Sequence, residues 1–98
     1  MEYTQLIIRR NQEVIFEDLT IGNVNGGHDI EMDGHDEPFA EMIFKTPRTE
    51  VLKRNLYRPL KGPDDLEALE TFTYDAYTIK VKNVLWDGEE VTLLVGKG

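Results

Sequence analysis

The sequence contains no cysteine and no serine, and these two absences exclude several kinds of chemistry. Without cysteine there is no disulfide bond, no thiolate zinc site and no thiol nucleophile. Without serine there is no Ser-His-Asp triad, and no threonine stands in a sequence context that would activate it as a nucleophile. Gly26-Gly27 is not followed by the Lys-Ser or Lys-Thr of a phosphate-binding loop. We therefore expect a protein that is not an enzyme.

Long apolar runs are also absent. No window approaches the roughly 20 apolar residues that cross a bilayer, and the N-terminus is not a basic stretch followed by an apolar one. We expect a soluble, cytoplasmic protein that makes no membrane contact. With 98 residues, of which 40% are hydrophobic, the chain should fold as a single domain over residues 1–98.

Basic residues are missing from one third of the chain, because charge occurs in blocks. No Lys or Arg lies between Asn11 and Phe44, a segment with nine acids: Glu13, Glu17, Asp18, Asp29, Glu31, Asp33, Asp36, Glu37 and Glu41. Residues 45–62 carry a net positive charge, residues 63–78 are again acidic, and the whole chain carries −8. Charge gathered on one surface attracts partners of the opposite sign, so these blocks indicate binding to a charged partner.

Two β-hairpins are predicted, one near each end of the chain. The N-terminal one joins residues 3–10 to residues 14–16 through Asn11-Gln12. The C-terminal one joins residues 77–86 to residues 91–95 through Asp87-Gly88. The alternation of apolar residues changes face near Asn83, which predicts a β-bulge there.

Between the hairpins we predict one or two short helices. Pro63, Asp64 and Glu67 form a typical helix start, and an apolar stripe follows, which predicts a helix over residues 64–72. Residues 46–56 could form a second helix after Thr46-Pro47, or alternatively a strand. The expected fold is thus a small α+β domain with an antiparallel sheet. Its predicted core is Leu6, Ile8, Val14, Phe16, Phe44, Leu66, Leu69, Phe72, Ile79, Val81, Trp86, Leu93 and Val95.

The segment 22–38 is rich in glycine and acids, and we expect it to be a mobile loop. Asp29, Glu31 and Asp33 followed by Gly34 resemble the start of a calcium-binding loop, but Ala40 stands where that loop needs a bidentate glutamate. The simpler interpretation is a short strand over residues 29–33 with a turn at Asp33-Gly34, which leads into residues 39–44.

From these features we expect a binding or regulatory protein that acts through protein–protein contact. Its partner would have a basic surface and would contact Asp29, Glu31, Asp33, Asp36 and Glu37. Two versions of this function are an inhibitor that mimics nucleic acid and an assembly component that adds a strand at a sheet edge, including formation of a homo-oligomer.

The alternative function is metal binding. His28 and His35, with Asp29, Asp33 and Asp36, could hold a divalent cation if a loop brought them together. We predict no other cofactor. Direct nucleic-acid binding by the basic residues of the 45–61 block is not expected, because the chain is acidic overall and these cations have acidic blocks on either side.

Overall fold

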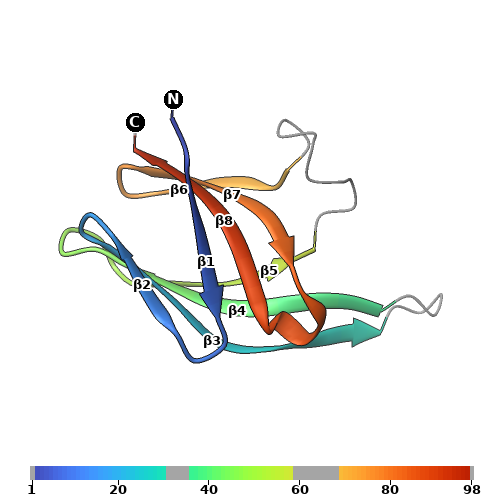
Figure 1. Cartoon of the computed structure of the whole chain (residues 1–98). Helices are drawn as coiled ribbons and strands as arrows, with labels where there is room; N and C mark the ends of the chain where they lie inside the picture. Colours follow the sequence, from blue (N-terminus) through green and yellow to red (C-terminus); the bar gives the residue numbers. More distant parts are fainter. Residues whose placement is uncertain (1, 31–35, 59–68, 98) are drawn as a thin grey trace.

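The computed structural model describes residues 2–30, 36–58 and 69–97, and in them the chain forms two four-stranded antiparallel sheets that share one core (Figure 1). In spatial order, the first sheet consists of β1 (Thr4–Arg9), β8 (Glu90–Lys97), β7 (Tyr77–Val84) and β6 (Thr71–Tyr74). The second sheet consists of β2 (Glu13–Phe16), β3 (Leu19–Ile30), β4 (Asp36–Lys45) and β5 (Leu52–Tyr57). A short 3₁₀ turn, η2 (Trp86–Gly88), connects β7 to β8.

The path of the chain explains this order. The second sheet is a simple meander, whereas the first sheet combines the meander β6–β7–β8 with β1 from the other end of the chain. From β2 to β5 and from β6 to β8, each strand is followed along the chain by the strand that it pairs with, as in an up-and-down barrel. Among the described strands this ring is open at two seams, between β1 and β2 and between β5 and β6, because the members of each pair belong to different sheets.

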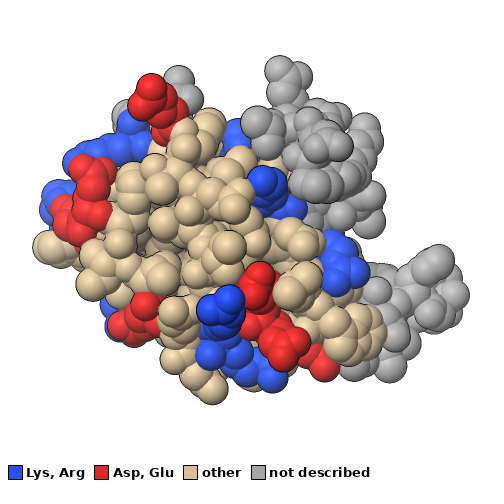
Figure 2. Space-filling model, in the orientation of Figure 1, with Lys and Arg blue, Asp and Glu red and all other residues tan. Residues whose placement is uncertain are grey.

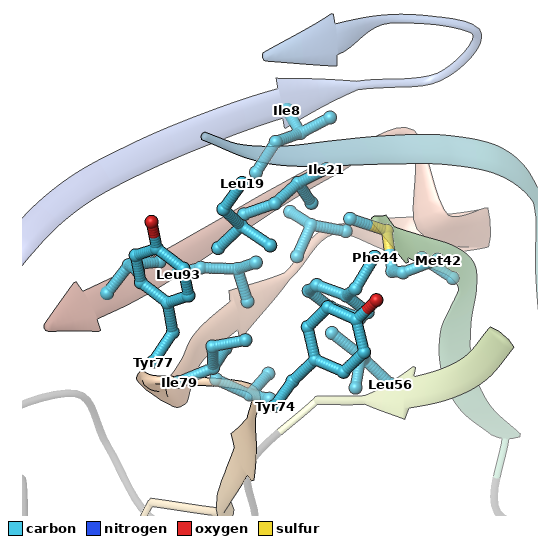
Figure 3. Close-up of a cluster of buried hydrophobic side chains, with 14 of the residues drawn as sticks. Ile8, Leu19, Ile21, Met42, Phe44, Leu56, Tyr74, Tyr77, Ile79 and Leu93 are labelled. Carbon is cyan, nitrogen blue, oxygen red and sulfur yellow. The ribbon is translucent and has the colours of Figure 1, made fainter. Parts of the chain in front are cut away.

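The core lies between the two sheets and is built by period-two alternation along the strands (Figure 3). In β7, Tyr77, Ile79 and Val81 point inward, while the residues between them are less buried. Both sheets contribute fully buried side chains, including Ile8, Leu19, Ile21, Met42, Phe44, Leu56, Ile79, Val81, Leu93 and Val95. Burial of these apolar groups is the main stabilising contribution of the fold.

The predicted α+β class is wrong, because the described residues are almost entirely β-strand. For residues 46–56 the predicted second helix is wrong and the alternative of a strand holds, because residues 52–57 form β5, in which Leu52, Arg54 and Leu56 alternate with more exposed residues. Of the predicted helix over residues 64–72, Thr71 and Phe72 belong to β6, and residues 64–68 lie outside the described residues. The stripe that suggested a helix reached Phe72, but Phe72 and Tyr74 follow the period of a strand.

The C-terminal hairpin is confirmed. Strands β7 and β8 pair antiparallel, and their register shifts between Val81 and Asn83, where the bulge was predicted. The N-terminal hairpin is wrong in its pairing, although both strands exist: β1 pairs with β8, and β2 pairs with β3. The chain turns at Asn11, where φ is 63°, and passes from one sheet to the other. Apolar residues of β1 and β2 can then face the core from opposite sides.

Most of the predicted core is confirmed as buried or as packed against the buried cluster. Trp86 is the exception, because it lies in η2 instead of extending β7 and is 47% exposed. Leu66 lies outside the described residues. The segment 22–38 belongs to β3 and β4 except for residues 31–35, which are also outside the described residues. The described chain has no helix long and apolar enough to cross a membrane.

Candidate protein-binding site

The hairpin formed by β3 and β4 extends beyond the strands on either side of it (Figure 1). Strand β2 pairs with β3 only as far as Gly22, and β5 pairs with β4 only as far as Phe39. Residues 28–30 and 36–38, which we call the hairpin end, therefore have no further described strand paired beside them, and one backbone bond from Arg58, just after β5, reaches Pro38. This is the part of the second sheet that can approach a partner without involving its neighbours.

An aromatic pair supports the base of the hairpin end on one side. Gly27 pairs with Phe39 across the strands, and a Cβ atom at Gly27 would lie 3.3 Å from the Phe39 ring. Phe39 in turn contacts Tyr57 of β5, with 5.8 Å between ring centroids. The Arg58 backbone N–H donates to the Pro38 carbonyl at 3.3 Å, and its Nε donates to the Val84 carbonyl of β7 at 2.9 Å. Both sheets thus hold the base of the hairpin.

The turn η2 fixes the same hairpin from the first sheet. A Cβ atom at Gly26 would lie 2.1 Å from the Asp87 carbonyl oxygen, so the two backbones touch. At Gly88, where φ is +69°, a Cβ atom would lie 2.3 Å from the Phe39 carbonyl oxygen and 3.0 Å from Ala40. These positions require glycine because a side chain would collide with backbone. The strands that lead to the hairpin end therefore have a defined position before any partner binds.

The pairing register places two acids at opposite positions in the hairpin end. Asp29 is opposite Glu37, Ile30 is opposite Asp36, and His28 is opposite Pro38. Like charges directly opposite each other in a sheet are destabilising. The structure thus places Asp29 and Glu37 of the predicted binding set in one cross-strand pair and Asp36 in the next pair, while Glu31 and Asp33 lie outside the described residues.

The remaining acids of the acidic block have a different role. Each of them forms an ion pair with a base from another part of the chain: Glu13 with Lys45 at 4.0 Å, Glu17 with Lys97 at 3.8 Å, Glu41 with Lys53 at 3.4 Å, and Asp18 with Arg48. Opposite charges lie next to each other around the edge of the face seen in Figure 2. Four of the nine acids of residues 11–44 thus form ion pairs in the described structure. The other five lie within residues 29–37, a segment that contains no Lys or Arg and whose acidic side chains the structure does not describe.

A second polar cluster lies on turns away from the hairpin end. Arg48 contacts Asp18 and also Asp75, the latter at 2.9 Å; Thr46 Oγ1 donates to Asp75 at 2.7 Å, and the Tyr77 hydroxyl donates to Asp18. The hydrogen bond from Arg48 lowers the pKa of Asp18, the bond from Thr46 lowers the pKa of Asp75, and burial raises the pKa of Tyr77. Because these groups bind one another, we assign the cluster to holding turns together.

Four described bases of the 45–61 block also pair with acids, while Arg58 donates to the Val84 carbonyl. Lys45, Arg48 and Lys53 pair with the acids named above, and Arg54 pairs with Glu70 at 2.6 Å while its guanidinium lies 4.3 Å from the Phe72 ring centroid. Lys61 lies outside the described residues. This pairing agrees with the expectation that the basic block does not contact nucleic acid, which stays a prediction.

The alternative metal site is only partly described. His28, Asp29 and Asp36 fall on neighbouring cross-strand pairs, whereas Asp33 and His35 lie outside the described residues. In the part of the chain that is described, no three His, Asp or Glu side chains form a group that could hold a metal ion. Metal binding therefore stays a prediction.

Sequence reasoning missed the residues that support the hairpin end, namely Phe39, Tyr57 and Arg58. One signal could have found Phe39. A turn centred on Asp33 implies the register in which Asp29 faces Glu37 and Gly27 faces Phe39, and an aromatic residue opposite a glycine commonly covers it. Comparison of the chain with protein-family models, curated proteins and solved structures finds no match. The site is therefore defined by its geometry.

Proposed function

We propose that this protein is a non-enzymatic binding module and that its hairpin end contacts the basic surface of a protein partner. The observation that carries the proposal is the register of β3 and β4, which places Asp29 opposite Glu37 beyond the neighbouring strands. An arrangement that opposes folding at this place is expected where it serves binding.

Charge and support both favour this function. Residues 29–37 carry five acids and no Lys or Arg, so they contribute −5 of the chain's −8. An acidic projection of this kind accelerates the approach of a basic partner, and salt weakens the attraction by screening. The base of the hairpin is fixed by Phe39, Arg58 and η2, which limits the ordering entropy lost on binding.

One version of the function is inhibition of a nucleic-acid-binding protein by mimicry of phosphates. In that version duplex DNA or RNA competes with the protein for its partner, because both occupy the same basic groove. A partner that nucleic acid does not displace would belong to a regulatory or assembly complex instead. Competition with nucleic acid therefore separates the two versions.

The experiment compares two charge-matched variants in affinity capture from lysate of the source organism. The test variant combines Asp29→Asn, Asp36→Asn and Glu37→Gln; the control combines Glu13→Gln, Glu17→Gln and Glu41→Gln, which removes the same charge from ion-paired acids. Wild type and control should retain the same basic protein at about 0.05 M salt and release it at about 0.5 M, and the test variant should not retain it.

Two outcomes would contradict the proposal. Equal retention by the test variant would place the interface elsewhere, and equal loss by both variants would reduce the effect to total charge. Binding constants of the identified partner for all three proteins then give the magnitude, which we expect to be at least tenfold in the dissociation constant for the test variant, since each such charge pair is worth about 0.5 to 1 kcal/mol or more.

A further inference from the structure

The described strands leave four sheet edges, and β1 is the edge with the least protection. Exposed edges in natural proteins are kept from pairing by short length, by charge or by proline. Strands β2 and β6 have four residues each, and β5 carries Lys53-Arg54 near its centre. By contrast β1 has six residues, and from Thr4 to Ile8 it contains no charge, no proline and no glycine. Among the described strands, none pairs with its outer side.

The hydrogen bonds at the end of β1 show which backbone groups point outward. Arg10 N–H donates to the Glu89 carbonyl on the β8 side, whereas Arg9 N–H donates to Gln12 Oε1 at 2.9 Å and the Arg9 carbonyl accepts from Gln12 N–H at 3.0 Å. Along an antiparallel strand, the backbone N–H and C=O groups of successive residues point to alternate sides. Even-numbered residues of β1 therefore bond to β8. The N–H and C=O groups of Tyr3, Gln5 and Ile7 therefore point to the free edge, and those of Arg9 are already used.

We propose that a second copy of the chain pairs with β1 through β1 of its own, antiparallel, about a two-fold axis at Gln5. In this register Gln5 is opposite Gln5 of the second copy, and Tyr3 is opposite Ile7 of the second copy. The outward-pointing backbone groups of Tyr3, Gln5 and Ile7 of each copy then have partners. The pairing stops at Arg9, whose backbone groups already bond to Gln12. The two first sheets become one continuous sheet, and the two-fold closes the assembly as a dimer.

The side chains of β1 favour a copy of itself over an unrelated strand. On the outer face, Ile7 is 42% exposed, and pairing would place it opposite Tyr3, an aromatic and β-branched combination that is favourable across strands. At the ends of the pair, Glu2 lies diagonally across from Arg10 of the second copy, so opposite charges meet twice. No like charges face each other in this register.

Salt distinguishes this interface from the hairpin end. Each copy carries −8, so the copies repel at low ionic strength and associate more tightly when salt screens the repulsion. Binding of a basic partner at the hairpin end changes with salt in the opposite direction. The dimer does not depend on the proposed function, and each can fail without the other.

The test is sedimentation velocity of the whole protein over a range of concentrations at about 0.05 M and about 0.5 M salt. Gln5→Pro removes the central outward N–H without removing a bond to β8. Ile7→Lys adds charge to the edge at an exposed position. The matched control is Ile15→Lys, which makes the same change on β2 at a residue that is 72% exposed.

We expect the wild type and Ile15→Lys to reach twice the chain mass of 11.3 kDa, more completely at high salt, while Gln5→Pro and Ile7→Lys remain monomers. Circular dichroism establishes that each variant keeps the wild-type fold. A wild type that stays monomeric at both salt concentrations overturns the proposal. A dimer that survives Ile7→Lys in folded protein also overturns it, and so does growth beyond a dimer, because the two-fold leaves no second β1 edge.

Discussion

At the scale of single residues, Asn23 links four segments of the chain. It is the buried polar side chain among the described residues, and its Nδ2 donates to the Gly88 carbonyl at 2.9 Å and, more weakly, to the Ile8 carbonyl at 3.4 Å. Its backbone N–H donates to the Gln12 carbonyl, and its carbonyl accepts from Asn11 N–H at 2.7 Å. One residue of β3 thus connects β1, the turn after β1, and η2.

Replacing this side chain should therefore destabilise the fold. Asn23→Ala leaves two buried carbonyls without their amide donor, which should lower the free energy of unfolding by about 1 to 3 kcal/mol. Asn25→Ala, on the same strand but exposed, is the control and should change it by less than about 0.5 kcal/mol. Urea denaturation monitored by circular dichroism measures both. Equal values for the two variants would contradict the role of Asn23.

The contact between Gly26 and Asp87 gives a second prediction at this scale. In Gly26→Ala the new Cβ would overlap the Asp87 carbonyl, so β3 and η2 must separate, and we expect a loss of about 1 to 3 kcal/mol in unfolding free energy. At Gly22 a Cβ would meet the flexible Glu13 side chain at 3.4 Å, so Gly22→Ala should be tolerated. Thermal and urea unfolding of the pair test this. A Gly26→Ala protein as stable as Gly22→Ala would show that the contact is not required.

At the scale of elements, the cluster of Asp18, Arg48 and Asp75 should make the fold sensitive to acid. The pKa values of both aspartates are lower in the folded protein than in the unfolded chain, so their contribution is present above about pH 4 and is lost as the pH falls through the folded-state values. Arg48→Gln should weaken this acid dependence. Lys53→Gln, which removes an exposed ion pair with Glu41, is the control and should leave the dependence unchanged.

The measurement is the melting temperature from about pH 6 down to about pH 2 for the three proteins. The melting temperatures of the wild type and Lys53→Gln should fall steeply below about pH 4. The melting temperature of Arg48→Gln should be lower at about pH 6 and should fall less with acid. Parallel curves for all three proteins would mean that the turn cluster does not link protonation to folding.

For the opposed acids of the hairpin end, Asp29 and Glu37, we predict that substitution increases stability. Asp29→Asn combined with Glu37→Gln removes a like-charge pair, so it should raise the free energy of unfolding by a few tenths to about 1 kcal/mol at low salt. Glu13→Gln with Glu41→Gln removes the same charge from ion-paired acids and should give no such gain. Chemical denaturation at about 0.05 M salt compares them. If the Asp29→Asn/Glu37→Gln variant is more stable and no longer binds its partner, the same two charges oppose folding and support binding.

The elements that sequence predicts well are those whose signal is local. The bulge near Asn83 followed from a change of face within one strand, and the C-terminal hairpin followed from alternation on both sides of a turn. The N-terminal strands were equally visible, but their pairing depends on β8, far along the chain, and on the turn at Asn11. Period two in β6 covers only four residues, which is too short to outweigh an apolar stripe at helical spacing.

The candidate site was predictable to a similar extent. Its acids were visible as a block without bases, and the turn at Asp33-Gly34 implied their register. The division of that block could not be seen, because Lys45, Lys53 and Lys97 approach their acids only through strand pairing and the meeting of the two sheets. The supporting contact of Arg58 with the Val84 carbonyl likewise joins different sheets.

At the scale of the whole molecule, the ring-like order of the strands predicts that a circular permutant can form the same fold. The chain ends lie close together, since Thr4 pairs with Val95 (Figure 1). If a short Gly/Ser linker joins the ends and the chain is opened between Gly62 and Pro63, each sheet becomes one continuous meander. Pairing of β1 with β8 then becomes local, so the permutant should fold faster than the wild type.

Stopped-flow refolding measures the rates, and circular dichroism establishes that the permutant has the native fold. A control permutant with the same linker, opened between Glu17 and Asp18, separates β2 from β3 in sequence and should not gain speed. Equal acceleration in both permutants would assign the effect to the linker. A Gly62/Pro63 permutant that does not fold would contradict the topology.

The pairing of β1 with β8 also has a consequence for the synthesis of the protein on the ribosome. Strand β1 is synthesised before its partner β8, which follows at least about 80 residues later, so at about 5 to 20 residues per second β1 waits roughly 4 to 16 s. Strands β2 to β5 can assemble in that time, whereas the uncharged segment from Thr4 to Ile8 has both edges free. For the nascent chain this is the period of greatest exposure to chaperones and to other newly made copies.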